Sequence, residues 1–531
     1  MSDVLVVGAG PVGLTMASEL ARHGIRCRIV DRMEIPLPYC RAIGVTPRTL
    51  EVWDDMGVAR EMVDAGLWLE GMRSYIDGHP VGDTAATFDD LPYSELGLPQ
   101  YETERLLGRH LARFGIAVER GVALSELVQD GTGVAARLEH ADGSAENARF
   151  RYVVGCDGAH SAVRHALGIG FPGEAFPMGF MLGDVRIEWD LPRGMALRAL
   201  RLNEDAAPDM FIAIPLPEAG RYRVSMLAPE PGDDAAGTDH GIQTEAKGPD
   251  LAAIAAVAAA LLPELPPISD LRWSSYFRIS MRLADRYRDG RVFIAGDAAH
   301  IHPPTGGQGM NTGIQDAYNL AWKLALVLQR AAPETLLDSY ESERRPVGAD
   351  VVQRTRAASE NYGRAKGEKP DRLADTQILV SYRGGDFVTA GEPPLPAHGP
   401  APGDRAPDAA GLRRRGIGFP VRLFDILRGT DHVLLVQLGD AGETALAELG
   451  AFAADLAATY GTHVRLCAIA PADVAWQPLM PLCVDAEGSF AAAYGPGETA
   501  VLVRPDGYVG WRGRSWRDAT LGSHLAKIFT A

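Results

Sequence analysis

The first part of the chain alternates between apolar runs of strand length and one apolar stripe of helical spacing. Val4 to Val7 form an apolar run, a glycine-rich turn covers Gly8 to Gly13, and a second apolar run covers Ile25 to Val30. Between the runs, apolar residues recur at Leu14, Ala17, Leu20 and Ala21. Helical spacing between two strand-like runs predicts a βαβ unit.

Two later apolar runs, Tyr152 to Gly155 and Arg291 to Ala295, each end in a Gly/Asp turn, so we expect them to join the same sheet. The stretch between them contains β-type runs at Met210 to Ile214 and Arg221 to Leu227. We therefore predict that residues 175–274 form a mostly antiparallel β domain inserted into the first domain.

The second half combines a helical region, a proline-rich segment and a further α/β pattern. Helical apolar spacing predicts a long helix that begins at Asn311 to Gly313, in a region that continues beyond Pro333. Six prolines between Gly391 and Pro407 predict an extended linker and a domain boundary. Beyond it the pattern predicts a strand, a helix, a strand and a hairpin turn, at His432–Leu438, Glu443–Tyr460, His463–Ala468 and Pro505–Gly507. The expected fold class is α/β, with domains at residues 1–174 with 275–390, residues 175–274, and residues 391–531.

Charge and composition exclude several functions. With 52 basic and 69 acidic side chains among 531 residues, the net charge is −17, which disfavours nucleic acid as a partner. The most apolar helix, Leu251 to Leu262, is shorter than the roughly 20 residues that cross a bilayer, and no secretory signal is evident. We expect a cytoplasmic protein with no membrane partner. The five cysteines are scattered and lack a C-x-x-C spacing, so we expect buried thiols. The same spacing argues against a disulfide framework, a metal site and a redox dithiol.

The turn from Gly8 to Gly13 is a G-x-G-x-x-G motif between a strand and a helix. Gly8 permits the tight turn, Gly10 lets the backbone approach a pyrophosphate, and Gly13 allows close packing of helix and strand. Asp31, at the end of the second strand, can accept hydrogen bonds from a ribose diol and would repel a 2′-phosphate. The motif predicts a bound ADP moiety and leaves FAD and NAD open.

Two further stretches favour FAD. Tyr152 to Arg164 contains Asp157-Gly158, Arg291 to His300 contains Gly296-Asp297, and both resemble the signatures of the class A flavoprotein monooxygenases, the family of p-hydroxybenzoate and phenol hydroxylases. The resemblance implies a Rossmann-type FAD-binding domain, FAD as cofactor, NADH or NADPH as a transient reductant, and O₂ as co-substrate. It also implies that oxygen reaches an aromatic ring through a flavin C4a-hydroperoxide.

The resemblance also assigns roles to single residues. Asp297 is expected to accept hydrogen bonds from the ribityl chain, and Asp157 to shape the region between FAD and the pyridine nucleotide. Arg41 is expected near the pyrophosphate, with a catalytic role as a further expectation, and Gln100 on the ribityl side. The complete set of expected cofactor residues is Gly8, Gly10, Pro11, Val12, Gly13, Asp31, Arg32, Arg41, Gln100, Asp157, Gly296, Asp297, Pro304, Gly307, Gly309, Met310 and Asn311.

The loop from His302 to Gly313 is expected to face the flavin. Its glycines permit a backbone close to a flat ligand, and the helix that follows can stabilise negative charge on a reduced flavin. By the resemblance, the carbonyl of Pro304 would contact the departing hydroxyl of the hydroperoxide, and the amides of Met310 and Asn311 would meet the ring. We expect structural roles for His300 and His302.

The sequence says less about the substrate than about the cofactor. Where p-hydroxybenzoate hydroxylase has a Ser-x-Arg element for the substrate carboxylate, this chain has Pro215 to Pro217, which favours a phenol or a polycyclic aromatic over a benzoate. Tyr222 could activate a phenol or could be a core tyrosine. The C-terminal residues resemble a thioredoxin-fold domain without its C-x-x-C motif, so we expect a structural or dimerisation role, with a homodimer as one possibility. Two alternatives stay open: a flavin oxidase or reductase that does not hydroxylate, and a flavin-free scaffold protein.

Overall fold

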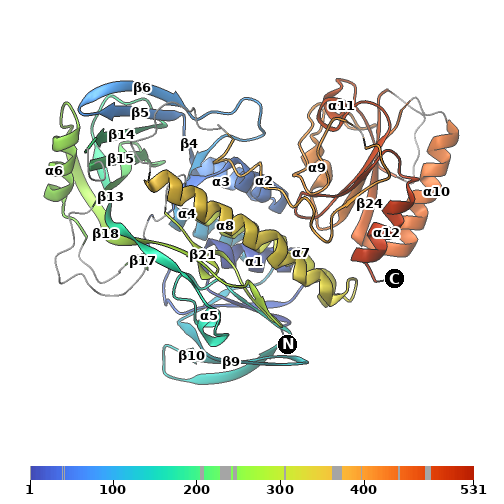
Figure 1. The fold of residues 1–531 in the computed structure, drawn as a ribbon, viewed down its shortest axis with the longest axis horizontal. Coiled ribbons are helices and arrows are strands. Elements are labelled where there is room, and N and C mark those ends of the chain that lie inside the picture. The colour runs from blue at the N-terminus through green and yellow to red at the C-terminus, as the bar shows by residue number, and fades with distance from the viewer. Residues whose placement is uncertain are drawn as a thin grey trace.

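The computed structural model (Figure 1) describes residues 2–38, 40, 42–203, 209–227, 241–242, 248–303, 307–360, 373–395, 397–439, 443–472 and 480–530. Two long helices, α7 (Gln308–Leu328) and α8 (Asp338–Glu360), cross the middle of the molecule. A large β-sheet lies on one side of them and the C-terminal domain on the other. The fold is α/β, with parallel and antiparallel sheets in different parts of the chain.

The first sheet confirms the predicted βαβ unit and joins the two later apolar runs to it. Its strand order is β19-β20-β12-β1-β2-β8, parallel throughout except between β19 and β20. The bounds are β1 Val4–Val7, β2 Cys27–Asp31, β8 Val118–Arg120, β12 Tyr152–Gly155, β19 Arg288–Asp289 and β20 Val292–Ile294. All four side chains of β1 are buried, as expected for a central parallel strand covered on both faces.

Helices and small sheets surround this sheet. Helix α1 (Pro11–Arg22) packs against α7 and α4 (Gln100–Ala112). The other helices here are α2 Pro47–Met56, α3 Ala59–Ala65 and α5 Ala162–Ala166. Two three-stranded sheets contain β3 Gly44–Val45, β4 Leu67–Trp68 and β7 Leu96–Gly97, and β9 Val122–Asp130, β10 Gly133–His140 and β11 Ala145–Phe150.

The predicted long helical region is two helices, and the first begins earlier than expected. Helix α7 starts at Gln308 and ends at Leu328. Two residues later, Arg330 adopts a left-handed φ of 63°. Pro333, which has no N–H for a helical hydrogen bond, precedes a short 3₁₀ turn at Glu334–Leu337 and then α8.

The second sheet is the predicted inserted domain and is mostly antiparallel, in the order β17-β18-β13-β16-β15-β14-β5-β6, with β21 beside β18. The bounds are β5 Gly71–Ile76, β6 His79–Ala85, β13 Gly173–Ile187, β14 Met195–Arg201, β15 Asp209–Pro215, β16 Arg221–Leu227, β17 Gly241–Ile242, β18 Ile268–Leu283 and β21 His300–Ile301. Helix α6 (Leu251–Leu261) packs on one face. Strands β5, β6 and β21, and the ends of β13 and β18, come from outside the expected range 175–274.

The C-terminal domain follows the predicted order of elements. Strands β26 and β27 form the hairpin around Pro505 to Gly507, and β23 pairs with both β26 and β24. The bounds are β22 Thr389–Ala390, α9 Leu423–Leu427, β23 His432–Gln437, α10 Glu443–Tyr460, a 3₁₀ turn Gly461–His463, β24 Val464–Ala470, β25 Leu482–Val484, α11 Ser489–Tyr494, β26 Thr499–Val503, β27 Val509–Gly513 and α12 Ala519–Ile528.

The proline-rich segment is not the extended linker that its composition predicts. Gly391 N–H donates to the carbonyl of Arg512, and Gly403 N–H donates to that of Val509. The Arg512 guanidinium donates in turn to the carbonyls of His398 and Pro400. Prolines lack the N–H but keep the carbonyl acceptor, so the segment packs along β27 through its acceptors and glycine amides.

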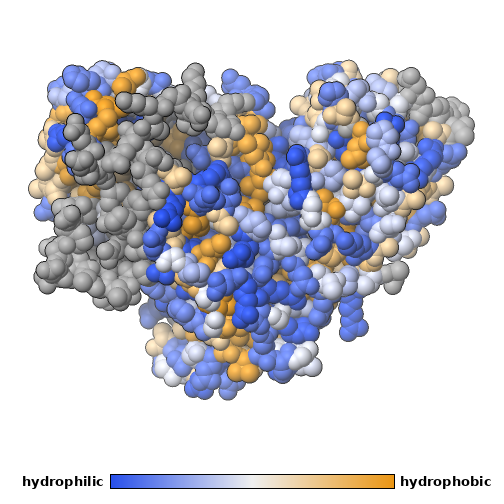
Figure 2. Space-filling view, viewed as in Figure 1, coloured by the Kyte–Doolittle hydropathy of each residue, from blue (hydrophilic) through white to orange (hydrophobic). Residues whose placement is uncertain are grey.

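The surface in Figure 2 mixes hydrophilic and hydrophobic residues over the described part of one face, with the hydrophobic ones in small groups. Among the described helices, none has the length and apolar character needed to span a bilayer.

Candidate active site

Three turns that are remote in sequence meet at the carboxyl edge of the first sheet. Strands β1, β12 and β20 are neighbours and run parallel, so the turns that follow Val7, Gly155 and Ile294 emerge side by side. Gly8 has a φ of 99°, and its N–H donates to the carbonyl of Val30 over 2.8 Å. A Cβ on Gly8 would lie 2.4 Å from the carbonyl oxygen of Cys156. The contact brings the first turn against the second.

The glycine turn leaves an open cradle in front of α1. A Cβ on Gly13 would lie 1.9 Å from the carbonyl oxygen of Gly8, so Gly13 serves close packing. Gly10 differs, because nothing lies within 4 Å of a Cβ built there. Pro11 opens the helix, where its missing N–H costs nothing, and Val12 packs against Gly296 and Gly313. The space beside Gly10 is therefore open at the start of a helix whose first amides have no intrahelical acceptor, which fits a pyrophosphate.

Asp31 is fixed beside this cradle. Its Oδ2 accepts from the Ala9 amide over 2.7 Å, and its Oδ1 accepts from the Met33 amide over 2.8 Å. Each carboxylate oxygen keeps further acceptor capacity for a ribose hydroxyl. Arg32, next in the chain, is exposed.

The other two turns present one half-buried and one exposed carboxylate. Asp157 accepts from the Val163 amide over 3.2 Å through Oδ2, while its buried Oδ1 has no partner among the described residues. Burial raises the pKa of Asp157 above its ordinary value, against hydrogen bonds that lower it. Asp297 follows Gly296 in a 3₁₀ turn, and its side chain is exposed at the cradle. An orphaned buried acceptor and an open cradle fit a bound dinucleotide with several hydroxyl donors.

Gln100 holds the segment around residue 42 to the start of α4. Its Oε1 accepts from the Ala42 amide over 3.3 Å, and its backbone amide donates to the Ala42 carbonyl over 3.0 Å. Arg41, which the resemblance places near the pyrophosphate, lies outside the described residues. Gln100 therefore holds Ala42, the next residue in the chain, and the contact of Gln100 itself with FAD stays a prediction.

The first turn of α7 is tied to strand β3. Asn311 is fully buried, its Nδ2 donates to the carbonyls of Gly44 and Gly307, and its Oδ1 accepts from the Thr46 amide. Gly307 caps the helix with a φ of 65°. Gly309 and Met310 follow in the first turn, where amides have no intrahelical acceptor. Pro304 lies outside the described residues, so its expected role stays a prediction.

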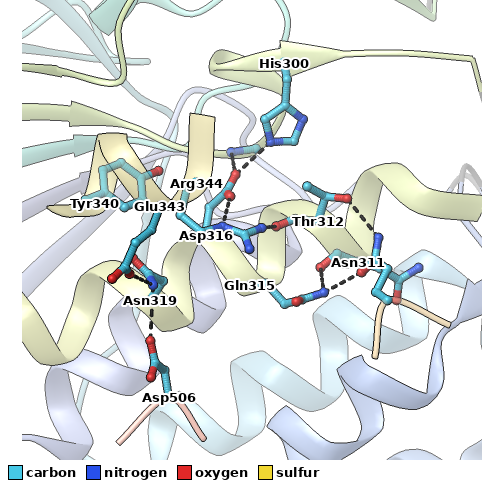
Figure 3. A network of polar contacts seen from close by, with 12 residues as sticks. His300, Asn311, Thr312, Gln315, Asp316, Asn319, Tyr340, Glu343, Arg344 and Asp506 are labelled. Carbon is cyan, nitrogen blue, oxygen red and sulfur yellow. Dashed lines mark hydrogen bonds and ion pairs between the residues drawn. The ribbon is translucent and has the colours of Figure 1, made fainter. Parts of the chain in front are cut away.

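A buried ionic cluster stands behind this turn (Figure 3). His300 Nε2 lies 2.7 Å from Asp316 Oδ2, and Arg344 Nε donates to Asp316 Oδ1 over 2.7 Å. Arg344 also donates to the carbonyl of Thr312. Burial alone would raise the pKa of Asp316, but Arg344 and His300 hold this pKa below its ordinary value. His300 has the structural role expected of it, because the cluster fixes α7 against the turn that carries Asp297.

A second buried network joins α7 and α8 to the C-terminal domain. Glu343 accepts from Asn319, Lys323 and Arg504, and Arg504 also pairs with Asp506 (Figure 3 shows Asn319, Glu343 and Asp506). Although burial opposes ionisation, Arg504 and Lys323 hold the pKa of Glu343 well below its ordinary range. The C-terminal domain is therefore fastened directly to the helix whose first turn faces the cradle.

Sequence reasoning missed both networks. Asp316 and Lys323 interrupt the apolar spacing of α7, and a charged residue within such a stripe is a signal of a buried ion pair.

His302 gives a pH-dependent prediction. Burial lowers its pKa to about 4, and its Nδ1 lies 2.9 Å from the Pro303 carbonyl. The unfolded chain, with a pKa of about 6.5, binds this proton first, so stability falls as pH drops from 6.5 towards 4. We expect His302→Gln to remove up to about 2 kcal/mol of that loss, measured by urea unfolding at pH 6.5 and 4.5. The exposed His79→Gln is the control; equal pH dependence in both variants would contradict the prediction.

Tyr222 lies on the face of the second sheet that packs against α6. It is buried in that core, with its ring edge-on to Trp189 at 5.1 Å between centroids. Because side chains alternate along a strand, Arg221 and Arg223 lie on the opposite face. Ile214, opposite Arg223 on β15, packs on that face against Cys40. The placement of Tyr222 favours the core role over the phenol-activating one.

A cavity of about 200 Å³ opens next to the contact between Ile214 and Cys40. Its lining includes Tyr101 at the start of α4, Leu216, Arg221 and Arg272. The cavity therefore lies where the second sheet meets the helix that starts at Gln100.

Two thiols of the C-terminal domain lie together despite their spacing in sequence. Cys467 on β24 and Cys483 on β25 are both buried, and their Sγ atoms are 4.0 Å apart. They are close because β25 pairs with β24 in the sheet, and not because of a C-x-x-C turn. The hydrogen bond to Cys483 and burial raise the pKa of the Cys467 thiol well above its ordinary value, which makes it a weak nucleophile.

Comparison with known families decides the identity of the cradle. A family model described as an FAD binding domain matches residues 1–355, and a model described as the C-terminal part of aromatic-ring hydroxylases matches residues 399–531. The chain belongs to the FAD-dependent aromatic-ring hydroxylases. The resemblance seen in the three motifs is thereby confirmed, as is the fold class of a Rossmann-type FAD-binding domain with an inserted β domain and a thioredoxin-like C-terminal domain.

Relatives of this hydroxylase match over nearly the whole chain. A flavin-dependent monooxygenase of Mycobacteroides abscessus is 36% identical, with 99% of each chain covered. The 12-dehydrotetracycline 5-monooxygenase/anhydrotetracycline 6-monooxygenase of Streptomyces rimosus is 33% identical, covering 96% of this chain and 95% of its own. The solved structure of aklavinone-11 hydroxylase with FAD and aklavinone superposes with a TM-score of 0.79 at 28% identity, covering 99% and 98%.

Proposed function

We propose that this FAD-dependent aromatic hydroxylase acts on a polycyclic phenol, using the second sheet as the substrate wall and the cradle of the first sheet as the FAD site. As in its family, it uses FAD, NAD(P)H and O₂. The observation that carries the proposal is the meeting of the three turns after β1, β12 and β20 at one edge of the sheet.

Bound FAD would take electrons from NAD(P)H and pass one oxygen atom of O₂ to the ring. The chain's part is binding, orientation and charge stabilisation. The open space at Gly10 admits the pyrophosphate, and Asp31 offers acceptors to the adenosine ribose. Asp297 is exposed in the turn after β20, where its carboxylate would accept hydrogen bonds from the ribityl hydroxyls. The amide of Met310 at the positive end of α7 would stabilise negative charge on the reduced flavin.

The relatives support a polycyclic phenol. The Streptomyces rimosus relative is named for 12-dehydrotetracycline and anhydrotetracycline, and the pentachlorophenol 4-monooxygenase of Sphingobium chlorophenolicum, 31% identical over 95% of this chain and 93% of its own, is named for a phenol with a single ring. A phenol oxygen donates electron density to the ortho and para carbons of its ring, and we propose hydroxylation at the ortho carbon.

Turnover with a panel of phenols and polycyclic aromatics tests this function. We expect at least one member to increase NAD(P)H oxidation by about tenfold or more and to gain one oxygen atom by mass spectrometry. NAD(P)H oxidation that no aromatic stimulates, with peroxide as the sole product of O₂, would contradict hydroxylation and indicate an oxidase.

The location and assembly of the chain are also proposals. All five cysteines are free thiols, which supports a cytoplasmic location, where thiols stay reduced. The fastening of Arg504 to Glu343 supports a structural role of the C-terminal domain within one chain. A homodimer would be detected by light scattering of the purified protein.

A further inference from the structure

One arginine of the second sheet is buried without a partner. Arg223 on β16 is 8% exposed, its Nε is buried without a hydrogen bond, and no described residue forms an ion pair with its guanidinium. Arg221, two residues earlier on the same face, is paired with Asp184 at 3.3 Å and with Asp270. An unpaired buried charge is costly, so a fold retains one where a ligand completes it.

The neighbours of Arg223 do not neutralise it. The register places Asp184 on β13 directly across from Arg223, yet the Asp184 carboxylate pairs with Arg221. Cys40 lies close to Arg223, but burial raises the pKa of its thiol to about 12 against the lowering effect of Arg223, so the thiol is neutral. Burial lowers the pKa of Arg223 itself, as expected for a cation without a counter-charge.

The surroundings suit an aromatic ring that carries an anionic oxygen. The next row of the same face runs across β15, β16, β13 and β18 as Ile212, Ser225, Leu182 and Ser275, which combines apolar side chains with hydroxyl groups. The face also approaches the FAD site, because Cys40 lies two residues before Ala42, which Gln100 holds. Arg223 therefore lies on the face of the second sheet that meets the segment around Cys40.

We propose that Arg223 binds an oxyanion of the aromatic substrate, a carboxylate, phenolate or enolate oxygen, and thereby selects acidic aromatics over neutral ones. The inference rests on the proposed function and names the substrate class for that site. It also changes the expectation from sequence, where the absence of a Ser-x-Arg element argued against an acidic aromatic. In this chain the cation that would pair with the substrate is Arg223 on β16.

Binding of matched probes to the FAD-loaded enzyme tests this proposal. The probes are 3-hydroxy-2-naphthoate and 2-naphthol, which differ by the carboxylate, titrated by isothermal calorimetry. We expect wild type to bind the naphthoate at least about tenfold more tightly, since a charge-assisted pair contributes about 1.4 kcal/mol or more. Arg223→Met should abolish this preference and Arg223→Lys should retain part of it. Tyr222→Phe, on the opposite face, should leave it unchanged.

A stability measurement separates this role from a structural one. Without ligand, Arg223→Met should melt about 2 to 4 °C higher than wild type, because it removes an uncompensated buried charge. A lower melting temperature, or a naphthoate preference that survives Arg223→Met, would overturn the proposal. Because the readout is binding and not turnover, a failure of hydroxylation would leave this result intact, and the two failures are distinguishable.

Discussion

Replacing Gly10 by valine will give a folded protein that purifies without FAD. Gly10 has φ −72° and ψ −177°, a conformation open to any residue, and no atom lies within 4 Å of the position that a Cβ would take. The chain alone therefore tolerates the side chain. A bound pyrophosphate would not, because its approach to the amides of α1 needs that space. We expect FAD affinity to fall by at least about a hundredfold, or roughly 2.7 kcal/mol, in a fluorescence titration.

Gly13→Ala is the matched control for this prediction. Its Cβ would lie 1.9 Å from the Gly8 carbonyl oxygen, so the fold itself should suffer, with a lower melting temperature as well as lost FAD. A Gly10→Val protein that is as yellow as wild type would show that FAD does not approach this turn.

The second large effect concerns the junction between α8 and the C-terminal domain. Glu343→Ala leaves the buried cations Lys323 and Arg504 without the carboxylate that both contact, at 2.7 Å and 2.6 Å. Removing one member of a buried ionic network costs about 3 to 5 kcal/mol, because Lys323 stays desolvated without a counter-charge and Arg504 keeps only Asp506. Urea unfolding should show this decrease in the free energy of unfolding, in the transition in which the C-terminal domain separates from α7.

Glu448→Gln provides the control for that variant. Glu448 pairs with Arg517 at the surface, where both side chains are about half exposed, so the loss should stay below about 1 kcal/mol. A Glu343→Ala protein as stable as Glu448→Gln would mean that the junction does not depend on this network.

The parts of the fold that follow local rules were predictable from sequence. The βαβ unit and α10, Glu443–Tyr460, each depend on residues close in the chain, and the structure has both as predicted. Strand β5 was not predicted in the second sheet, because its partner β14 lies more than a hundred residues away and strand periodicity does not name a partner.

For the site, the three turns were predicted because glycine and aspartate carry a conformational or charge signal at fixed positions. Arg223 was missed although a pattern in the sequence indicates it. Arg221, Arg223 and Ser225 alternate with the apolar or aromatic residues of β16, as in a strand with one polar face. The contact between Cys467 and Cys483 was missed for another reason, since it depends on which strands are neighbours.

A crystal structure of the protein with FAD tests the central assignment most directly. The result expected is one FAD molecule that runs from the amides after Gly10, past Asp157 and Asp297, to a flavin ring at the first turn of α7. Density for the flavin in any other cleft, with the space at Gly10 filled by solvent, would contradict it.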